Sequence, residues 1–492
     1  MHWQNTLDEL DRLIREGHAQ SARRKLFKLC TTKIPRSVTL PLASLARRVR
    51  LAGQGIRLLN PFVRSTRKAP ADASDAERVE YGACLLGIGA TEEALNLFRQ
   101  FDARKMPDVL LYEAFALVTQ WDYAGSIPLL TTYLQNPQLS DYQRLVGKTN
   151  LAAACVHEKK LTGALALLET LIQETHRANL LLLQGYCLQL LAQGQILQQK
   201  WSAARQSLSG AASVLKDAGT LDEFFVRKWQ AVLEVSKNGP RSGSLIQLRK
   251  VASEARALGH WETQRDCELV EATVTRNKKL ALYLHFGTPY PAFRSRIISE
   301  MGPTFRIPSE FVWDGSLTAN ARTIIDLKSG KLPNGSGLKV GQTLHRLLVA
   351  LCTDFYRPLR VAPLHYLLYP DEFYNPLSSP MRVHQAIKRL KIWFHQTAIP
   401  LTVEENNGTY RLVQKGSCAI SIPRDKACNS LKDYSLSLLR TGFKQTPFTA
   451  ADAQNALNIS RMSVLRLLQA ATRAGTIQRT GTGSVTSYRF IR

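Results

Sequence analysis

The sequence predicts a mainly α protein, with an N-terminal α-solenoid of helical hairpins followed by two small α+β domains. Three observations lead to this fold class. Up to about Thr275, apolar residues recur with the 3.6-residue period of amphipathic helices. Beyond about Glu310, short β-prone segments alternate with Gly, Asn and Pro. Basic residues are concentrated in this second half of the chain.

The first half contains one well-formed repeat, "VEYGACLLGIGATEEALNLFRQFDARKMP". Small residues would let two antiparallel helices approach closely, large apolar residues would fill the seam, and a proline would end the second helix. These positions are Gly82, Leu85, Gly89, Ala94, Phe98 and Pro107.

Similar spacings of small residues recur along the first half. Ala152 and Ala164 are twelve residues apart, as are Ala192 and Ala204, and "WDYAGSIPLL" supplies Ala124. Roughly Thr6 to Thr275 therefore resembles the tetratricopeptide-repeat family, with divergent and elongated hairpins. The resemblance implies a concave groove that binds a protein or peptide segment. The alternative is a packed array that only spaces or dimerises the second half.

We divide the chain into five segments by these changes in pattern. Residues 1–275 form the helical repeat domain, residues 276–309 a connector, and residues 310–415 the first small domain. Residues 416–432 form a linker, and residues 433–492 the second small domain.

The net charge of +26 is unevenly distributed. Residues 1–275 carry 35 Lys and Arg against 27 Asp and Glu, which gives +8, whereas residues 276–492 carry 30 against 12, which gives +18. A basic excess of this density favours a polyanionic partner, because Lys and Arg gain free energy by releasing condensed counterions. A merely soluble basic surface is the alternative.

The stretch "RVHQAIKRLKIWFHQTAIPLTVEENNGTYRLV" predicts a helix followed by a β-hairpin. Val383, Ile387, Leu390 and Phe394 fall on one face of the helix. The rest of the surface carries cations and an amide that could reach phosphates and base edges: Arg382, Gln385, Lys388, Arg389 and Lys391. Asn407-Gly408 is a preferred pair for a tight hairpin turn.

Together with the preceding β-prone segment and two helices, residues 310–413 resemble the winged-helix DNA-binding domain of OmpR/PhoB-type response regulators. The resemblance implies that residues matching Arg382, Gln385, Lys388 and Arg389 face double-stranded DNA. It also implies contacts from the wing, for which our candidates are Asn406, Asn407, Tyr410 and Arg411. The loop "PDEFYNPLSSP" matches a segment that touches RNA polymerase in some members. No receiver domain is visible in the sequence, so phosphorelay control does not carry over.

The last sixty residues repeat this pattern. Thr449 and Asp452 form a capping-box-like start, a second helix runs from Ser460, and "TIQRTGTGSVTSYRF" reads as a hairpin. The segment resembles many bacterial winged helix-turn-helix domains, which bind DNA or dock proteins. Its candidate DNA contacts are Arg461, Ser463, Arg466, Gln469, Arg479, Thr480 and Thr482.

The sequence contains no P-loop, nucleophile elbow, zincin motif or dinucleotide fingerprint, so we expect neither catalysis nor a cofactor. None of the eight cysteines forms a C-x-x-C pair, so we expect no structural metal site, and this usage fits a reducing compartment. The uncharged run 178–199 contains six glutamines, which disfavour a membrane span. We expect a cytoplasmic, nucleoid-associated protein.

The sequence supports three hypotheses of function. The first is a sequence-specific DNA-binding transcriptional regulator of bacterial type, whose helical array senses a partner or signal. The second is a non-catalytic adaptor that uses the array and the winged helices to dock proteins. The third is a replication or partition initiator with tandem winged helices.

Overall fold

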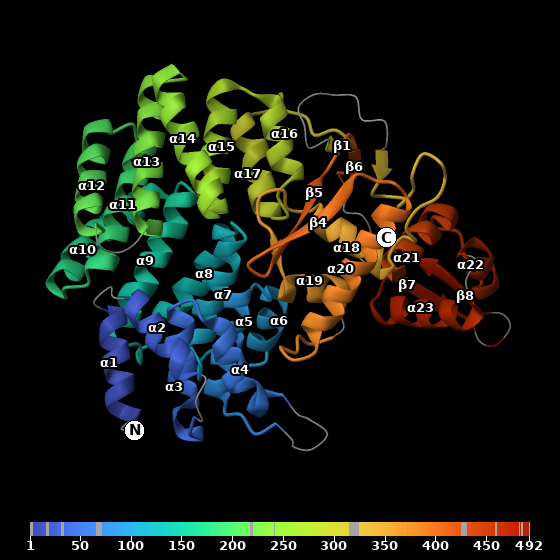
Figure 1. The fold of residues 1–492 in the computed structure, drawn as a ribbon, viewed down its shortest axis with the longest axis horizontal. Helices are drawn as coiled ribbons and strands as arrows, with labels where there is room; N and C mark the ends of the chain where they lie inside the picture. The colour runs from blue at the N-terminus through green and yellow to red at the C-terminus, as the bar shows by residue number, and fades with distance from the viewer. Residues whose placement is uncertain are drawn as a thin grey trace. The chain divides into compact units, whose positions relative to one another are not determined.

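The computed structural model describes residues 3–491, apart from residues 16–18, 31–33, 65–70, 217–219, 241, 314–323, 371, 425–430, 458–459, 482 and 484–485. The chain is mainly α, with small sheets only in its second half (Figure 1). The first half consists of successive helices: α1 Trp3–Arg15, α2 Ala19–Leu29, α3 Thr39–Arg48, α4 Ala52–Val63, α5 Asp75–Ile88, α6 Thr91–Phe98, α7 Asp108–Thr119, α8 Tyr123–Leu134, α9 Asp141–His157, α10 Leu161–Arg177, α11 Leu181–Leu197, α12 Trp201–Val214, α13 Thr220–Asn238, α14 Ser242–Leu258 and α15 Trp261–Thr275.

One turn recurs between neighbouring helices of this array. The residue before the N-cap of the second helix has positive φ, as at Gly89, Lys159 and Gln199. The next amide then donates to the carbonyl five residues back, as Lys160 N does to Cys155 O at 2.8 Å. This is the Schellman arrangement, which satisfies carbonyls that the end of a helix leaves open. The array is therefore built from helical hairpins, as the sequence predicts.

The small residues lie where the hairpin helices meet. A Cβ on Gly82 would be 2.4 Å from Cε1 of Phe98, so only glycine allows α5 and α6 to approach this closely. Ala94, Ala164 and Ala204 each lie four residues after the N-cap of their helix and are buried.

Two residues of the expected repeat pattern are placed differently. Ala124 is exposed, and the position four residues after the N-cap Asp122 is Ser126, which is fully buried. The hydroxyl of Ser126 donates to Tyr123 O at 2.8 Å, so this small polar residue can replace alanine. Pro107 does not end α6, which stops at Phe98; it is the N-cap of α7.

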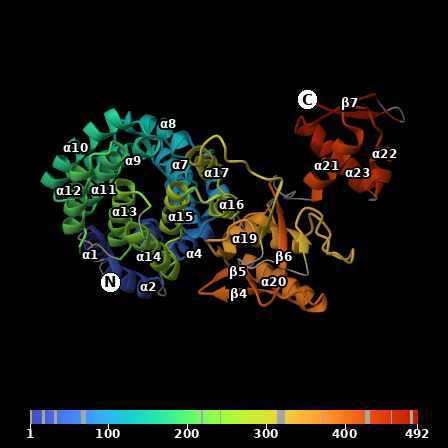
Figure 2. The ribbon, with the colours of Figure 1, turned by 90° about the horizontal axis from the view of Figure 1, so that it is seen from above.

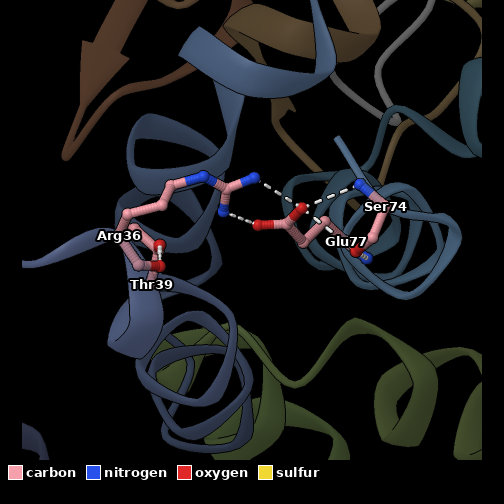
Figure 3. Close-up of polar contacts among 4 residues, drawn as sticks. All are labelled: Arg36, Thr39, Ser74 and Glu77. Carbon is pink, nitrogen blue, oxygen red and sulfur yellow. Dashed lines mark hydrogen bonds and ion pairs between the residues drawn. The ribbon is translucent and has the colours of Figure 1, made fainter. Parts of the chain in front are cut away.

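Helix α5 starts with a capping box that an ion pair reinforces (Figure 3). Ser74 Oγ accepts a hydrogen bond from Glu77 N at 3.3 Å, and Glu77 Oε2 accepts one from Ser74 N at 2.8 Å. Both oxygens of Glu77 also contact the guanidinium of Arg36, with Nη2 at 2.8 Å from Oε2, and Thr39 Oγ1 donates to Arg36 O (Figure 3). The short 3-10 helix 36–38 is thereby held against the start of α5.

The segment 276–309, expected to be a connector, continues the array. It contains α16 Lys278–Phe286 and α17 Pro291–Met301, and the Schellman turn appears again between α15 and α16, where Asn277 N donates to Ala272 O at 3.0 Å. Leu284, Phe293 and Ile297 are fully buried in one cluster with Leu269 of α15. The aromatic and proline residues that weaken the helical period in the sequence thus pack onto the last hairpin.

By internal contacts the chain forms two compact units, neither of which is one continuous stretch. The array unit comprises Met1–Ile307, Thr353–Pro380 and Asn407–Thr409, and the second unit comprises Pro308–Cys352, Met381–Asn406 and Tyr410–Arg492. The chain therefore crosses between the units five times.

The segment 353–380 packs into the core of the array unit. It contains the two-residue strand β3 Leu359–Arg360 and helix α19 Val361–Leu368. Ala362 belongs to the cluster that surrounds Ala94, and Tyr356 to the cluster that surrounds Phe293. The loop "PDEFYNPLSSP" follows α19: Tyr374 N donates to Glu93 Oε2 at 2.9 Å, while Phe373 and Leu377 are 69% and 81% exposed.

The second unit contains a sheet that differs from the expected antiparallel one. β1 Glu310–Trp313 and β2 Ile324–Asp326 flank β6 Ala419–Pro423, in the order β1-β6-β2. β1 pairs antiparallel and β2 parallel with β6, so that Ile420 lies opposite both Trp313 and Ile325. The central strand thus comes from the segment 416–432, which we expected to be a linker.

The remaining elements of the second unit follow the expected order. α18 Thr343–Leu351 and α20 Ser379–Gln396 precede the neighbouring strands β4 Leu401–Asn406 and β5 Thr409–Gln414. The C-terminal part has α22 Ala450–Leu457, α23 Arg461–Arg473 and the antiparallel pair β7 Ile477–Thr480 and β8 Ser487–Phe490. A further helix, α21 Leu431–Phe443, was not expected from the sequence pattern; it buries Leu439 in the same cluster as Val464 and Phe448.

Among the described helices, none is long and apolar enough to cross a bilayer. The described cysteines are free thiols.

Candidate ligand groove and candidate nucleic-acid interface

The hairpins of the array follow one another around a curve, from α8 past α10 and α12 to α15 (Figure 2). Inside the array unit lies a cavity of about 600 Å³, which we call the groove cavity. Its lining comes from many helices, and its apolar part is formed by Leu180–Leu183 at the start of α11 with Val146, Phe225 and Trp229. A volume of this size holds several amino-acid residues or a small molecule.

One wall of the groove cavity carries side-chain amides. Gln189 and Gln193 lie one turn apart on α11 and are only 8% and 4% exposed. Within the described residues neither amide has a hydrogen-bond partner. Asn150 of α9 also lines the cavity and donates one N–H to Val146 O at 2.8 Å. An amide offers both donors and an acceptor, which is what the backbone of an extended peptide requires.

Another part of the lining carries a network of charged side chains. Asp266 accepts from Lys228 Nζ at 2.8 Å and lies 3.4 Å from Nη1 of Arg296. Burial alone would raise the pKa of Asp266, but the two cations hold that pKa below its ordinary value. Glu262 also lines the cavity, and its pKa is raised by burial and by the charge of Asp266. This part of the lining therefore offers a ligand fixed charged groups instead of apolar contacts.

A stacked pair of rings, from the start of α8 and the end of α9, also lines the cavity. The rings of Tyr123 and His157 lie 3.9 Å apart at an interplanar angle of 9°. Burial, together with the charge of Arg296, lowers the pKa of His157 to about 3. His157 is thus neutral at physiological pH, with its ring nitrogens available for neutral hydrogen bonds.

In the second unit, α20 divides into a buried and an exposed face as the sequence predicts. Val383, Leu390 and Phe394 are 0%, 0% and 1% exposed. Gln385, Lys388, Arg389 and Lys391 are exposed, and Arg382 is half-buried. In the described part of the chain, no ion pair involves Lys388, Arg389 or Lys391. The exposed face therefore presents cations that form no ion pair with a carboxylate of the described residues.

The hairpin after α20 has the turn that its sequence predicts. Asn407 and Gly408 have φ of 50° and 73°, which is the type I′ pattern. Asn406 and Asn407 are exposed. Tyr410 is 8% exposed, and its ring lies 5.9 Å from that of His384, so its side chain packs inside the domain instead of joining the exposed set. Arg411 is exposed but paired with Glu404 at 3.2 Å.

The C-terminal candidates also lie on exposed surfaces. Arg461, Ser463, Arg466 and Gln469 of α23 and Arg479 and Thr480 of β7 are all exposed. Ser460 caps α23 by accepting from Ser463 N at 3.3 Å, and Thr480 Oγ1 bonds to Ser487 Oγ at 2.8 Å. Thr482 lies outside the described residues. Val464, Leu467, Leu468 and Ala471 form the buried stripe, as expected.

The residues of the groove cavity are absent from the sequence-predicted site. One signal was present: the glutamines of the run 178–199, of which Gln189 and Gln193 have the i, i+4 spacing of one helix face. The charged wall had no comparable signal, because Lys228, Glu262 and Asp266 are spread over two helices far apart in the sequence.

The chain matches no protein-family model and no curated protein by sequence. Among solved structures, it is similar to a Rap protein complexed with competence and sporulation factor, at 10% identity and a TM-score of 0.42, over 57% of this chain and 84% of that one. It is also similar to the apo form of RapI, at 11% identity and a TM-score of 0.37, over 57% of this chain and 85% of that one. These values are too low for the likeness to bear on function.

Proposed function

We propose that the helical array binds an extended peptide, or an extended segment of a protein, in the groove cavity. The observation that carries this proposal is the combination in one cavity of an apolar wall with the side-chain amides of Gln189 and Gln193. Apolar side chains of a peptide would be buried against Leu180–Leu183 and Trp229. Its backbone would exchange hydrogen bonds with the amides.

The physical argument rests on unused hydrogen-bonding capacity. The amide atoms of Gln189 and Gln193 are not among the buried polar atoms cut off from solvent, so they face the cavity and can exchange water for hydrogen bonds to a ligand. A peptide backbone restores both kinds of hydrogen bond at a regular spacing, whereas a hydrocarbon ligand would restore neither. The indole N–H of Trp229 is a further buried donor in this cavity without a partner among the described residues.

Selection from a synthetic hexapeptide library tests this function. Intact protein is equilibrated with the library, and bound peptides are identified by mass spectrometry. Ala153→Phe, which adds a ring inside the cavity, should abolish recovery of the peptides that the wild type enriches. Ala166→Phe is the matched control, because Ala166 lies exposed on α10, outside the cavity lining. Equal recovery by both variants would place peptide binding elsewhere.

A second proposed function is binding of double-stranded DNA by the second unit, which would make the chain a peptide-responsive transcriptional regulator. What supports it is the exposed face of α20, with Lys388, Arg389 and Lys391 outside any ion pair of the described residues, next to a tight hairpin. A helix followed by such a hairpin is the winged-helix arrangement, which can place side chains on base edges and phosphates.

Fluorescence anisotropy with a selected duplex tests DNA binding. Lys388→Ala with Arg389→Ala should weaken binding about 5- to 150-fold, since one lost base contact costs about 1–3 kcal/mol. The matched control is Arg104→Ala with Lys105→Ala, a pair of adjacent exposed cations in the array unit. If no duplex is selected by the wild type, the chain acts as an adaptor for proteins instead.

A further inference from the structure

A second cavity of about 400 Å³ lies in the array unit and continues the groove cavity. The two share the lining residues Thr119, Trp121, Phe225 and Glu262, so they adjoin, and a ligand that passes these residues would reach both. The second cavity is lined by three arginines: Arg50, Arg357 and Arg360. We call it the arginine cavity. Arg265 also lines it, but that guanidinium is already paired with Asp354.

The positive charge of the arginine cavity is not balanced. Its only carboxylate among the described lining residues belongs to Glu262. No ion pair within the described residues involves Arg50, Arg357 or Arg360; the side chain of Arg360 donates to Gly87 O at 3.3 Å. The pKa of Arg360 is lowered by burial and by the charge of Arg357. Arg50 and Arg360 are exposed and Arg357 is half-buried, so water screens part of the repulsion between these like charges, and an anion placed between them would reduce it further.

The three arginines come from distant parts of the chain. Arg50 is the positive-φ residue of the turn between α3 and α4, whereas Arg357 and Arg360 belong to the segment 353–380. This segment is fixed on the array by the buried pair Arg265–Asp354, and Asp354 Oδ1 also accepts from Arg357 N at 2.9 Å. The cluster is therefore built by tertiary packing and differs from a solvated face of one helix.

We propose that the arginine cavity binds a carboxylate of the peptide whose apolar residues occupy the groove cavity. This inference rests on the proposed peptide function. A guanidinium matches a carboxylate with two parallel hydrogen bonds, and several guanidiniums around one cavity favour a single anionic group over a neutral one. The carboxylate can come from the C-terminus of the peptide or from an Asp or Glu side chain. Both sources share this chemistry.

A nucleic-acid backbone fits this cavity less well than a peptide. The volume is that of a few residues, and the neighbouring groove cavity has an apolar wall, against which a charged phosphodiester chain would be desolvated without a hydrogen bond. A peptide supplies apolar side chains for the apolar part of the groove cavity, a backbone for the amides and a carboxylate for the arginines. The position of the carboxylate relative to the apolar side chains is thereby fixed.

The test compares four hexapeptide pools on the intact protein: free acids or C-terminal amides, each with or without Asp and Glu. Wild type should recover peptides from the pools that carry the recognised carboxylate about ten- to hundredfold better than from the amide pool without acids. Preference for free acids alone identifies the C-terminus, and preference for acidic pools alone identifies a side chain. Equal recovery from all four pools overturns the inference while leaving the proposed function intact.

Variants separate a charge role from a structural one. Arg357→Gln with Arg360→Gln should remove the carboxylate preference while apolar selection persists, whereas the exposed control Arg104→Gln should retain both. Arg50→Glu, on an exposed side chain, should shift selection toward amidated and Lys-containing peptides, which no packing defect would do. An unchanged preference in well-folded variants overturns the inference. Absence of any enriched peptide from the wild type overturns both this inference and the proposed function.

Discussion

Arg265 of α15 and Asp354 form an ion pair whose side chains are 1% and 3% exposed. The guanidinium carbon of Arg265 lies 4.9 Å from the ring centre of Tyr356 and 5.4 Å from those of Trp121 and Tyr290. Tyr356 in turn donates to Glu268 Oε2 at 2.6 Å. The segment 353–380 is therefore fastened to the last hairpins of the array by groups that have been removed from water.

We expect Asp354→Ala to lower the free energy of unfolding of the array unit by about 3–5 kcal/mol, because it leaves the arginine charge buried without a partner. Asp354→Asn should cost less, since its side-chain oxygen can still accept from the amides of Tyr356 and Arg357. Urea unfolding followed by tryptophan fluorescence measures both. The control is Glu254→Ala, which breaks the half-exposed pair with Arg227 and should cost less than about 1 kcal/mol.

Two glycines of neighbouring helices should respond in opposite directions to alanine. In Gly82→Ala the new Cβ would overlap the ring of Phe98, which is fully buried, and we expect a loss of about 1–3 kcal/mol. In Gly53→Ala the Cβ meets no atom within 4 Å, and we expect a gain of about 0.4–1 kcal/mol from the restricted unfolded chain. Thermal melting of the intact protein checks the pair. Equal shifts would contradict the close approach of α5 and α6.

Mild acidification should lower the free energy of unfolding of the protein, and His157 should contribute to this loss. Its folded-state pKa of about 3 lies below its unfolded value of about 6.5, so the unfolded chain binds the proton more readily. The contribution is complete above about pH 6.5 and is lost as the pH falls toward 3. Arg296 and Lys228 reinforce this shift and Asp266 opposes it.

In His157→Phe, which keeps a ring beside Tyr123, this part of the acid sensitivity should be absent. Burial also lowers the pKa of His285, to about 4. The quantity to compare is therefore the difference in free energy of unfolding between wild type and variant at each pH. We expect that difference to change by about 1–2 kcal/mol between pH 7 and pH 5. Parallel stability curves for the two proteins would show that folding does not lower the pKa of His157.

If the C-terminal part joins the proposed DNA complex, Arg466→Glu with Arg479→Glu should flatten the salt dependence of binding. Each lost phosphate contact reduces the slope of log affinity against log salt by about 0.9. Lys444→Glu, on another exposed cation of the same unit, serves as the control. A DNase footprint should shorten in the double variant but not in the control. Identical slopes and footprints would favour a protein-docking role for this part.

Local features of the fold could be predicted from the sequence because they depend on neighbours in the chain. The capping box at Thr449, in which Asp452 Oδ2 accepts from Thr449 N at 2.8 Å, is one example. The Asn407-Gly408 turn is another. The small residue of the hairpin that contains α8 was not predicted correctly: the sequence pattern indicated Ala124, but Ser126 occupies the buried position. The N-cap at Asp122 determines which residue of α8 faces the partner helix.

Features that join distant segments could not be predicted in this way. Strand β6 looked like a linker because its pairing partners, around Val312 and Ile325, lie about a hundred residues earlier. Both cavities join side chains from helices far apart in the sequence, and the arginine cavity also depends on segment 353–380, which no periodic pattern assigns to the array. Nothing in the sequence brings Arg50 beside Arg360.

The five crossings of the chain between units also set an order of events during translation. The first 307 residues leave the ribosome before segment 353–380, whose last residue lies 73 positions later. At about 5–20 residues per second this interval lasts about 4–15 s. Before Asp354 and Ala362 emerge within this interval, Arg265 lacks the carboxylate that pairs with it in the folded protein, and the apolar surface that later receives Ala362 is uncovered. The nascent array therefore passes through a stage in which it exposes apolar surface and a charge that the finished protein buries.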